Sequence, residues 1–559
     1  MKNNHKGLQL TAWMLSMLGL FWLAGQPPAA AQENKKGIDM KKGERVLFFD
    51  DRYVEEMKEL TRVMHPAVKH AGNPVLKADK PWEVSDRKAG IGIVHVYGTV
   101  RKEGDLFKIW YQVYPRSGKL YWVCYATSKD GIHWEKPALD LIEYNRLKRG
   151  EFTEEEVKGN NIVLINCGRP GATMACSPTI SVDPDEPDPN RRYKMLFWDF
   201  GVRYYEPGQY MGGCVAFSPD GIRWTPYPGN PVLVASDVTD ATWDPVERRY
   251  IAHFKLYQLL TEAADPARPV EMEKPAEFFL VGRKKPTQEK DTILAEAYFL
   301  DTTLQQVTLE TRTLRNCRRI SDRRIVARAE SKDFINWTNY RAAIIPDRLD
   351  AANQQTYGMS AFRYEGLYVG LLRIMTGQSI DIQLAYSNDG ADWQRCFDRT
   401  SFIPCGAAGG WDAGMVLTAS EPVLVGEELW FYYGGWQKQH HEWGETSIGI
   451  AKLRRDGFVS LDAGEKEGEL LTRPVTVSGP RLKVNAAAAG GAVAAEVLDE
   501  SGRVIPGYGR KECRPVAADT TAGELTWAGN RNLSALAGRK VRVRFFLKQA
   551  HLYSFWQGE

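Results

Sequence analysis

The chain has almost no net charge and lacks the usual cysteine and histidine patterns of a metal site. Its 559 residues include 73 basic and 70 acidic side chains, so the formal net charge is only +3. This balance creates no overall field to attract nucleic acid or anionic membranes, and neither is an expected partner. The eight cysteines form no Cys-x-x-Cys pair and no histidine cluster has zinc spacing, so we expect no bound metal of this kind.

One long apolar run, Leu8 to Ala24, lies at the N-terminus behind two lysines. Residues 26–31 then end in alanines before Gln32, which is the layout of a secretory signal peptide over residues 1–31. An uncleaved membrane anchor is the alternative for a run of this length, but the prolines and alanines favour cleavage. We expect an exported protein, secreted or periplasmic, with no membrane attachment after cleavage.

Export raises the question of disulfides, because oxidising compartments favour them. Cys124 and Cys214 occupy the same place in two repeats, four residues before the repeated Ser described next, and are expected to be small buried core residues. Cys396 and Cys405 are near enough in sequence to pair, but their spacing does not require it.

A seven-residue phrase returns four times: Ser, any residue, Asp, usually Gly, two more residues and Trp. The copies begin at Ser128, Ser218, Ser331 and Ser387, and the third has Phe334 in place of Gly. Asp-Gly favours a tight turn because glycine takes a positive φ and aspartate can accept hydrogen bonds from the amides of the turn. A phrase repeated over several hundred residues indicates one supersecondary unit built several times.

Short aromatic-rich strands repeat in step with this phrase. They are expected at residues 107–111, 193–197, 250–254, 367–371 and 429–433. Each follows a polar turn and another strand-like run, and the fifth unit ends in a worn copy of the phrase at Asp456-Gly457. Four strands per unit, repeated radially, is how a β-propeller protects its strand edges. The sequence therefore predicts an all-β fold with a five-bladed propeller.

The repeats also predict the domain boundaries. We expect an N-terminal segment over 32–75 that helps to close the ring or packs beneath it, and the propeller over 76–472. An insertion of about 258–318 in blade 3 contains strand-like runs at 278–281 and 297–300. From Arg473 onward the repeat stops, and alternating segments separated by Gly-rich turns predict a C-terminal β-sandwich over 473–559.

Residues 126–134, with the Asn-Pro-Val-Leu segments at Asn73 and Asn230, resemble the five-bladed propeller glycosidases of glycoside hydrolase families 32, 43, 68 and 130. The propeller followed by a sandwich is similar to the layout of family 32. This resemblance implies an active site in the central pocket, where acids from different inner strands act as base or nucleophile and as acid. It implies no cofactor, and leaves open a structural calcium at the ring axis.

The register of the repeats gives a short list of catalytic candidates. Inner strands are expected around Tyr97, Ser177, Asp240, Tyr357 and Glu421. Asp240 and Asp412, the latter in a Gly-rich loop leading to the last blade, are the principal catalytic candidates, followed by Glu83 and Glu421. A turn or strand-edge aspartate that caps backbone amides is the alternative for Asp240. The first blade has no acid over residues 90–98, so the three-acid set of the relatives does not map cleanly.

Aromatic side chains near these acids are candidates for stacking on sugar faces. They are Trp82, Tyr97, Tyr357 and Trp411, with core packing between blades as the alternative for each. Asp237, which flanks Asp240, is placed with them as a substrate-binding residue.

Two further groups of polar residues are candidate ligand sites. His440-His441-Glu442 suggests a metal, but adjacent side chains in an extended segment point apart. Arg323, Arg324 and Arg341 could neutralise an acidic sugar, a sulfate or a phosphate, with solvated surface charge as the alternative.

The sequence thus predicts an exported glycoside hydrolase that cleaves a polysaccharide or oligosaccharide with paired carboxylates. A propeller that binds carbohydrate without catalysis is the first alternative, favoured by the missing acid in blade 1. A glycoside phosphorylase is the second, and it requires a basic cluster beside the acids.

Overall fold

The computed structural model describes residues 41–86, 90–114, 120–147, 152–199, 212–272, 279–282, 287–301, 306–442 and 444–559. The expected signal peptide lies outside these residues. Regular structure is almost entirely strand, with two four-residue helices, α1 (Tyr144–Leu147) and α2 (Glu154–Val157), and a few turns of 3-10 helix. The prediction of an all-β protein is confirmed. In the described part of the chain, no helix is long and apolar enough to cross a membrane.

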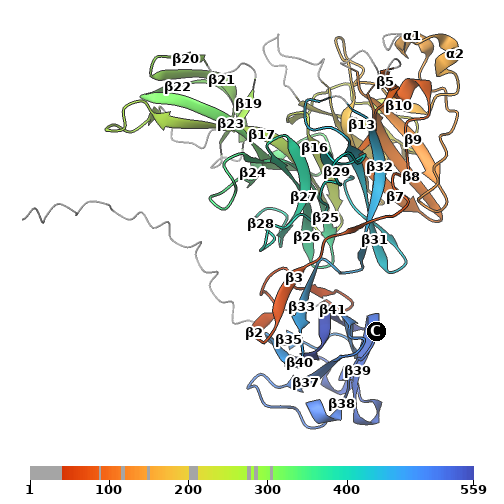
Figure 1. The fold of residues 1–559 in the computed structure, drawn as a ribbon, viewed down its shortest axis with the longest axis vertical. Helices are drawn as coiled ribbons and strands as arrows, with labels where there is room; N and C mark the ends of the chain where they lie inside the picture. Colours follow the sequence, from red (N-terminus) through yellow and green to blue (C-terminus); the bar gives the residue numbers. More distant parts are fainter. Residues whose placement is uncertain are drawn as a thin grey trace, which may run out of the picture.

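Groups of antiparallel strands follow one another along the chain and form a ring (Figure 1), and the last two groups are joined into one nine-stranded sheet by a parallel bridge between Ile380 and Met415. The first contains β7 (Val94–Glu103), β8 (Leu106–Val113), β9 (Trp122–Ser128) and β10 (Ile162–Leu164). The second contains β11 (Cys176–Val182), β12 (Tyr193–Trp198), β13 (Gly212–Ser218), β14 (Thr225–Pro226) and β15 (Leu233–Val234). The third is built on β16 (Thr239–Asp244), β17 (Arg249–Ala263), β23 (Cys317–Ser331) and β24 (Thr338–Ile344).

The fourth group contains β25 (Gln354–Tyr364), β26 (Leu367–Thr376), β27 (Ser379–Ser387) and β28 (Trp393–Arg395). The fifth contains β29 (Met415–Thr418), β30 (Val423–Val425), β31 (Glu428–Trp436), β32 (Thr446–Arg454) and, from the start of the chain, β4 (Val68–Lys69).

The innermost strands close the ring. β7 contacts β11, β11 contacts β16, and β16 contacts β25. The fifth group bridges to β27 between Ile380 and Met415, and its strands β29 and β31 contact β7. The outer edge of the fifth group is closed by β4, which pairs with β32. The last blade is thus completed by the N-terminal segment, which ties the two ends of the ring together.

The repeated phrase forms the same hydrogen-bonded turn four times. In the first copy, Ser128 Oγ accepts a hydrogen bond from the backbone amide of Gly131 at 2.9 Å. Asp130 Oδ1 accepts from the backbone amides of Ile132 and His133, both at 2.8 Å. Gly131 has φ +76°, and the Phe334 that replaces it in the third copy has φ +67°. Tyr432 Oη, from blade 5, donates to the Gly131 carbonyl at 2.8 Å. The turn therefore joins neighbouring blades as well as neighbouring strands.

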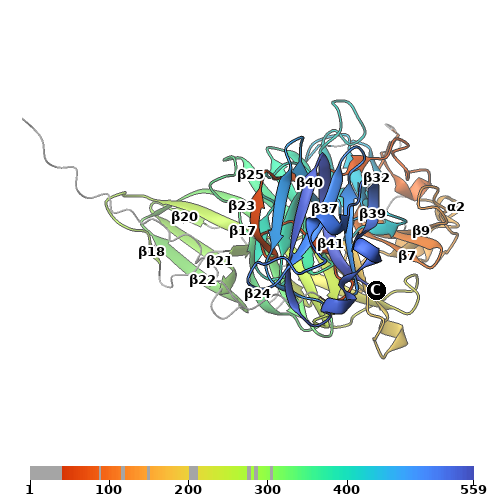
Figure 2. The same cartoon turned by 90° about the horizontal axis from the view of Figure 1, so that it is seen from below.

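A second unit, two facing sheets, lies beside the ring (Figures 1 and 2). One sheet contains β1 (Val46–Leu47), β3 (Thr61–Met64), β33 (Val459–Ala463), β36 (Arg481–Ala487), β38 (Cys513–Arg514), β39 (Asp519–Trp527) and β41 (Ala550–Gly558). The other contains β2 (Val54–Lys58), β34 (Gly468–Thr472), β35 (Val475–Thr476), β37 (Ala492–Leu498) and β40 (Lys540–Lys548). Apolar residues of both sheets share one core with blades 4 and 5. The expected boundary at residue 473 falls between β34 and β35 of this unit.

Asp456, in the worn fifth copy of the phrase, links the ring to the second unit. Its fully buried carboxylate forms an ion pair with Arg45 at 2.6 Å and accepts from Ser554 Oγ at 2.6 Å and Tyr364 Oη at 2.7 Å. These partners come from the N-terminal segment, β41 and blade 4. A buried carboxylate is tolerated here because each oxygen has charged or polar donors.

The insertion in blade 3 lengthens β17 and β23 into an arm that projects from the ring (Figure 1). It carries β18 (Glu271–Met272), β19 (Phe279–Gly282), β20 (Thr287–Glu289), β21 (Thr292–Asp301) and β22 (Gln306–Arg315). The two strand-like runs predicted from the sequence pair as β19 and β21.

All eight cysteines are free. Cys124 and Cys214 are fully buried in the core, as the repeat predicts. Cys396 and Cys405 do not pair with each other.

Candidate functional site

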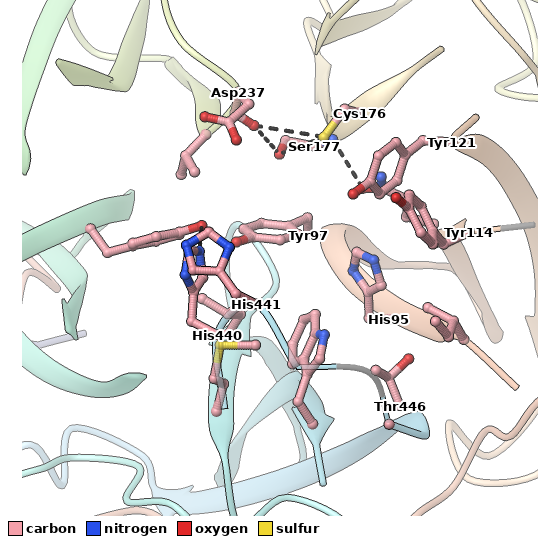
Figure 3. A pocket seen from close by; sticks show the side chains of 18 of the residues that line it. His95, Tyr97, Tyr114, Tyr121, Cys176, Ser177, Asp237, His440, His441 and Thr446 are labelled. Atoms are coloured by element: carbon pink, nitrogen blue, oxygen red, sulfur yellow. Dashed lines mark hydrogen bonds between the residues drawn. The ribbon is translucent and has the colours of Figure 1, made fainter. Parts of the chain in front are cut away.

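A cavity of about 430 Å³ opens on the ring axis, where the innermost strands of all five blades begin (Figure 3). Its lining includes His95, Tyr97, Tyr114, Tyr121, Cys176, Ser177, Asp237, Tyr357, Met415, Trp436, His440, His441 and Glu442. The strands converge here because each blade directs its first strand at the axis. Three residues singled out in the sequence, Tyr97, Tyr357 and Asp237, are brought together in this cavity.

The carboxylate of Asp237 lines the cavity, and Asp237 lies just before the start of β16. Its side chain is surrounded by the protein yet keeps 43% of its surface exposed, because it faces the open cavity. The Lys255 ammonium forms an ion pair with it, and Ser236 Oγ donates to Oδ1 at 2.9 Å. Burial pushes the pKa of Asp237 upward, but Lys255 and these donors outweigh burial and hold the pKa below its ordinary value. Asp237 is therefore an ionised carboxylate at neutral pH.

Tyr357 and His440 form one side of the cavity. Tyr357 Oη and His440 Nε2 are 3.1 Å apart, and their rings meet edge to face. Burial, together with His441, Arg324 and Lys255, lowers the pKa of His440 to about 4, so the imidazole is neutral at pH 7. The rings of His440 and His441 are 3.8 Å apart and both line the cavity. The prediction that these adjacent side chains point apart is wrong, because the segment turns here instead of running extended.

Aromatic rings from blades 1 and 5 form the opposite side. The rings of Tyr114 and Tyr121 are 4.2 Å apart, and His95 packs between Tyr97 at 5.4 Å and Trp436 at 4.8 Å. Burial lowers the pKa of His95 to about 3, so it is neutral at pH 7. This wall offers flat apolar faces with hydroxyl groups at their edges, a surface that suits a sugar ring.

Ser177 and Cys176 lie between these walls, where β11 begins. Ser177 has φ +52° and donates through Oγ to the carbonyl of Asp237 at 2.7 Å, which fixes the backbone beside the carboxylate. Burial, then the charge of Asp237, raises the pKa of the Cys176 thiol to about 12. A thiol that stays protonated is a poor nucleophile, so we assign Cys176 no role in bond cleavage.

Asp240 lies in a buried polar layer across the axis, three residues further along the chain than Asp237. It is 2% exposed, and its Oδ2 accepts from Ser360 Oγ at 2.8 Å. Arg373 in turn donates to Ser360 Oγ at 2.5 Å. Burial raises the pKa of Asp240 to about 7, although Arg373 opposes the rise. The catalytic role of Asp240 stays a prediction, and its side chain is enclosed by this layer.

Glu421 lines a second cavity, of about 410 Å³, formed where the innermost strands end. It forms an ion pair with Arg101 at 2.8 Å. The inner strand of blade 5 is β29, which ends at Thr418, so Glu421 follows the inner strand and does not begin it. This register places it at the end of the axis opposite Asp237.

The remaining predicted residues are held in the packing of the blades. Asp412 Oδ2 accepts from Lys69 Nζ at 2.5 Å and from Tyr433 Oη at 3.0 Å, while Trp411 stacks on Tyr433 with ring centroids 5.4 Å apart. Both lie where blade 5 meets the N-terminal segment.

Glu83 and Trp82 are similarly enclosed beside blade 1. Glu83 is fully buried, bonded to Tyr111 Oη at 2.6 Å and to Lys136 Nζ at 2.7 Å. The Trp82 indole donates to Asn161 Oδ1 at 2.9 Å and is 3% exposed.

Several lining residues were absent from the sequence prediction. His95 is two residues before Tyr97 on β7, so strand alternation places both on one face, and this signal could have found it. Tyr114, Tyr121 and Trp436 lie at strand ends or in loops, and only the fold brings them to the axis, while the sequence named Glu442 only beside His440 and His441 as a possible metal ligand. In the described part of the chain, no three His, Cys, Asp or Glu side chains gather as a metal site.

Strand topology and cavity together define an all-β propeller with a polar, aromatic-lined pocket on its axis and an appended two-sheet unit. No family model matches the sequence, and no curated protein matches it. Solved structures to which the chain is similar include a glycosyl hydrolase from Bacteroides ovatus, at 12% identity over 70% of this chain and 94% of that chain, with a TM-score of 0.37.

Two further matches belong to families that the sequence resembles. One structure is described as a member of the GH130 family of mannoside phosphorylases that contains hydrolases acting on β-1,2 mannosidic linkages in Candida mannan. It shares 13% identity over 70% of this chain and 94% of that chain, with a TM-score of 0.39. The other, a GH32 β-fructofuranosidase of Bombyx mori, shares 10% identity over 91% and 95%, with a TM-score of 0.35. At such TM-scores these likenesses do not establish an activity.

Proposed function

We propose that this protein is a glycosidase-like enzyme that binds a saccharide in the axial cavity and cleaves a glycosidic bond there. One observation carries the proposal: the cavity combines flat aromatic walls with two carboxylates, Asp237 and Glu442, that come from different blades. Aromatic faces bind sugar rings, and glycosidic cleavage requires two carboxyl groups with different roles. The similar structures reported above are named as glycoside hydrolases, which is consistent with this proposal.

The two carboxyl groups differ in their surroundings, as the reaction requires. Asp237 is held ionised by Lys255, which suits a base or a nucleophile. Glu442 is exposed in the loop between β31 and β32 and accepts from the Gln439 amide at 3.0 Å. In this proposal Glu442 acts in its protonated form: its carboxyl group gives its proton to the leaving oxygen and becomes a carboxylate, while Asp237 acts on the other side of the sugar ring.

Saccharide binding without cleavage is the alternative that a specific observation favours. One Asp237 oxygen already accepts from Ser236 while the carboxylate is paired with Lys255, so part of its bonding capacity is used. In that case the cavity retains glycans and releases no sugar. Phosphorolysis is a further alternative, distinguished by sugar release that requires added phosphate.

The test is release of reducing sugar from a panel of plant, algal and microbial polysaccharides and their oligosaccharides. The wild-type protein is expected to release sugar from at least one of them. Asp237→Asn and Glu442→Gln are each expected to lower kcat at least about 100-fold, since each removes a group that acts in the transition state.

The matched controls are carboxylates outside the axial cavity. Glu421→Gln, in the second cavity, and Asp412→Asn, in blade 5, are expected to keep kcat within a few-fold of wild type. Loss of activity in these variants with normal activity in Asp237→Asn and Glu442→Gln would refute our assignment. Retention of glycans with no release by any protein would establish the binding alternative.

We also propose that the protein is exported after cleavage behind residue 31. The proposal rests on the basic, apolar and alanine-rich order of residues 1–31. N-terminal sequencing of protein recovered from the periplasm or the medium tests it. A mature chain that begins at Gln32 is expected, and an intact N-terminus in the membrane fraction contradicts it.

A further inference from the structure

Two cations lie on the face of blade 3 that borders the axial cavity. In the antiparallel pair of β17 and β23, Tyr257 is opposite Arg324 and Lys255 is opposite Val326. Cross-strand partners share a face, and residues two apart on one strand share it too. Lys255, Tyr257 and Arg324 therefore point to the same side of the sheet, at the root of the projecting arm.

Both cations pack against Tyr357, whose ring lines the cavity. The Lys255 ammonium lies 4.9 Å from the centre of the Tyr357 ring, and the Arg324 guanidinium lies 5.3 Å from it. The Tyr257 ring also lies 5.6 Å from Lys255 and 5.8 Å from Arg324. Two rings thus contact both side chains and restrict their motion, which reduces the entropy lost when a ligand binds.

The two cations differ in whether their charge is neutralised. Lys255 is paired with Asp237. Arg324 donates from Nη1 to the neutral side-chain oxygen of Gln355 at 3.0 Å, and among the described residues no carboxylate forms an ion pair with it. Glu442, the other acid of the cavity, accepts from the Gln439 amide. This edge of the cavity therefore keeps one positive charge that has no carboxylate partner.

The positive charge of Arg324 also affects the pKa of the His440 imidazole. His440 lines the cavity beside Tyr357, and Arg324 and Lys255 both help to lower its pKa, after burial and His441. His440 is thus close enough to Arg324 to be affected by it. Arg324 is not itself a lining residue, but it lies directly against the ring of Tyr357, which lines the cavity.

We infer that the saccharide bound in this cavity is acidic, and that Arg324 binds a carboxylate or sulfate substituent of the sugar at the edge formed by blades 3 and 4. A guanidinium suits such a group because its planar fork donates two parallel hydrogen bonds to carboxylate or sulfate oxygens. The inference rests on the proposed function, since it names the class of saccharide for the same cavity.

Arg323 provides a matched control. It is adjacent to Arg324 on β23 but lies on the opposite face of the sheet, where its Nε donates to Gln258 Oε1 at 2.7 Å. Arg323→Gln and Arg324→Gln therefore remove the same charge from the same strand, and only Arg324→Gln removes it from the cavity side.

The experiment measures binding of matched acidic and neutral glycans by calorimetry, with wild type, Arg324→Gln and Arg323→Gln at low and high salt. The carboxylate arm compares oligogalacturonides with their methyl esters, and the sulfate arm compares carrageenan oligosaccharides with their desulfated forms. Wild type is expected to bind the acidic member of one pair more tightly, and less so at high salt. Arg324→Gln is expected to weaken that binding about 10- to 100-fold, and Arg323→Gln to leave it unchanged.

Other outcomes overturn the inference in distinguishable ways. Equal affinity for neutral and acidic members, unchanged in Arg324→Gln, refutes the acidic ligand and leaves the proposed function standing. An equal loss in Arg323→Gln shows a general charge effect. Binding of neutral glycans that requires inorganic phosphate assigns the cation to free phosphate. Failure to bind any glycan overturns the proposed function together with this inference.

Discussion

At the scale of single residues, Asp237 and Asp240 show how the surroundings of a carboxyl group set its role. Asp237 lies just before β16 and keeps 43% of its side chain exposed, while Asp240 lies within β16 and is 2% exposed. Asp237 faces a cavity and a lysine, so its pKa is lowered, while Asp240 is enclosed and its pKa rises to about 7. Of these two residues, only Asp237 combines an ionised carboxylate with access to a ligand.

Lys255 is expected to set the acidic limb of the pH profile through Asp237. Replacing Lys255 with Met removes the charge that holds the pKa of Asp237 down, so this pKa rises and the acidic limb of kcat/KM moves to higher pH. For each unit by which this pKa rises, the ionised fraction of Asp237 falls about tenfold at pH values below the pKa. Lys136→Met, which removes another buried lysine paired with Glu83, is the control and should leave the limb in place. An unmoved limb in folded Lys255→Met contradicts this account.

Asp240 is expected to make the fold less stable as pH rises. Its pKa increases from the ordinary value of 3.8 to about 7 on folding, so the native state holds a proton that the unfolded chain has lost. The contribution of this group is fully present below pH 3.8 and is lost as pH rises through about 7, at a slope of at most about 1.4 kcal/mol per unit. Asp240→Asn should remove this slope and raise the unfolding free energy at pH 8. Urea unfolding at pH 5 and pH 8 measures it, and an unchanged slope would falsify the prediction.

At the scale of elements, the repeated turn shows why the sequence predicts the blades so well. Ser and Asp bond the amides of their own turn, so the phrase specifies a local structure that needs no distant partner. Four copies of one local structure then fix the register of the strands around them. Tyr97, Tyr357 and Asp240 were placed on inner strands in this way, and the structure has them on β7, β25 and β16.

The glycine of the repeated phrase is expected to be required for two reasons. Its φ is positive, and a neighbouring side chain leaves no room for a Cβ. A Cβ on Gly131 would lie 2.5 Å from Tyr432 Oη and 3.0 Å from the Phe107 ring, whereas a Cβ on Gly104, which also has positive φ, would meet nothing within 4 Å. Gly104→Ala should therefore cost only the backbone strain, about 1 kcal/mol, and Gly131→Ala about 1–2 kcal/mol more. Thermal and urea unfolding compare the two, and equal losses would show that the contact between blades is unimportant.

At the scale of the whole molecule, the ring depends on a segment that precedes it in the sequence. β4 supplies the outer strand of blade 5, and Lys69 of this strand carries the ammonium that neutralises Asp412. The carboxylate is nearly buried, at 6% exposure, so its partner matters more than in a surface pair.

Loss of this ion pair is expected to destabilise the closed ring. Lys69→Ala leaves Asp412 with Tyr433 as its other donor and should lower the free energy of unfolding by about 2 kcal/mol. Lys466→Ala removes a lysine from an exposed pair with Glu59 and should change stability by less than about 0.5 kcal/mol. Chemical unfolding measures the free energy of unfolding of both variants. Similar losses in the two would mean that closure of the ring does not depend on the ion pair of Lys69 and Asp412.

The composition of the cavity could be predicted from the sequence only in part. Tyr97, Tyr357 and Asp237 lie on or beside inner strands, so the blade register identifies them. Tyr114, Tyr121 and Glu442 reach the axis from strand ends and loops, whose directions are set by tertiary packing. Asp412 and Glu83 have the residue type and approximate position expected of catalytic acids, but lysines and tyrosines from distant segments enclose them. No local pattern distinguishes such a partnered acid from one that faces a ligand.

The most direct test of the account is the structure of the Asp237→Asn variant crystallised with an oligosaccharide from the panel that the wild type binds. The account predicts sugar rings in the axial cavity, against Tyr97, Tyr357 and the wall of Tyr114 and Tyr121, with a glycosidic oxygen near residue 237. Sugar bound in the second cavity beside Glu421, or only on the two-sheet unit, would contradict it.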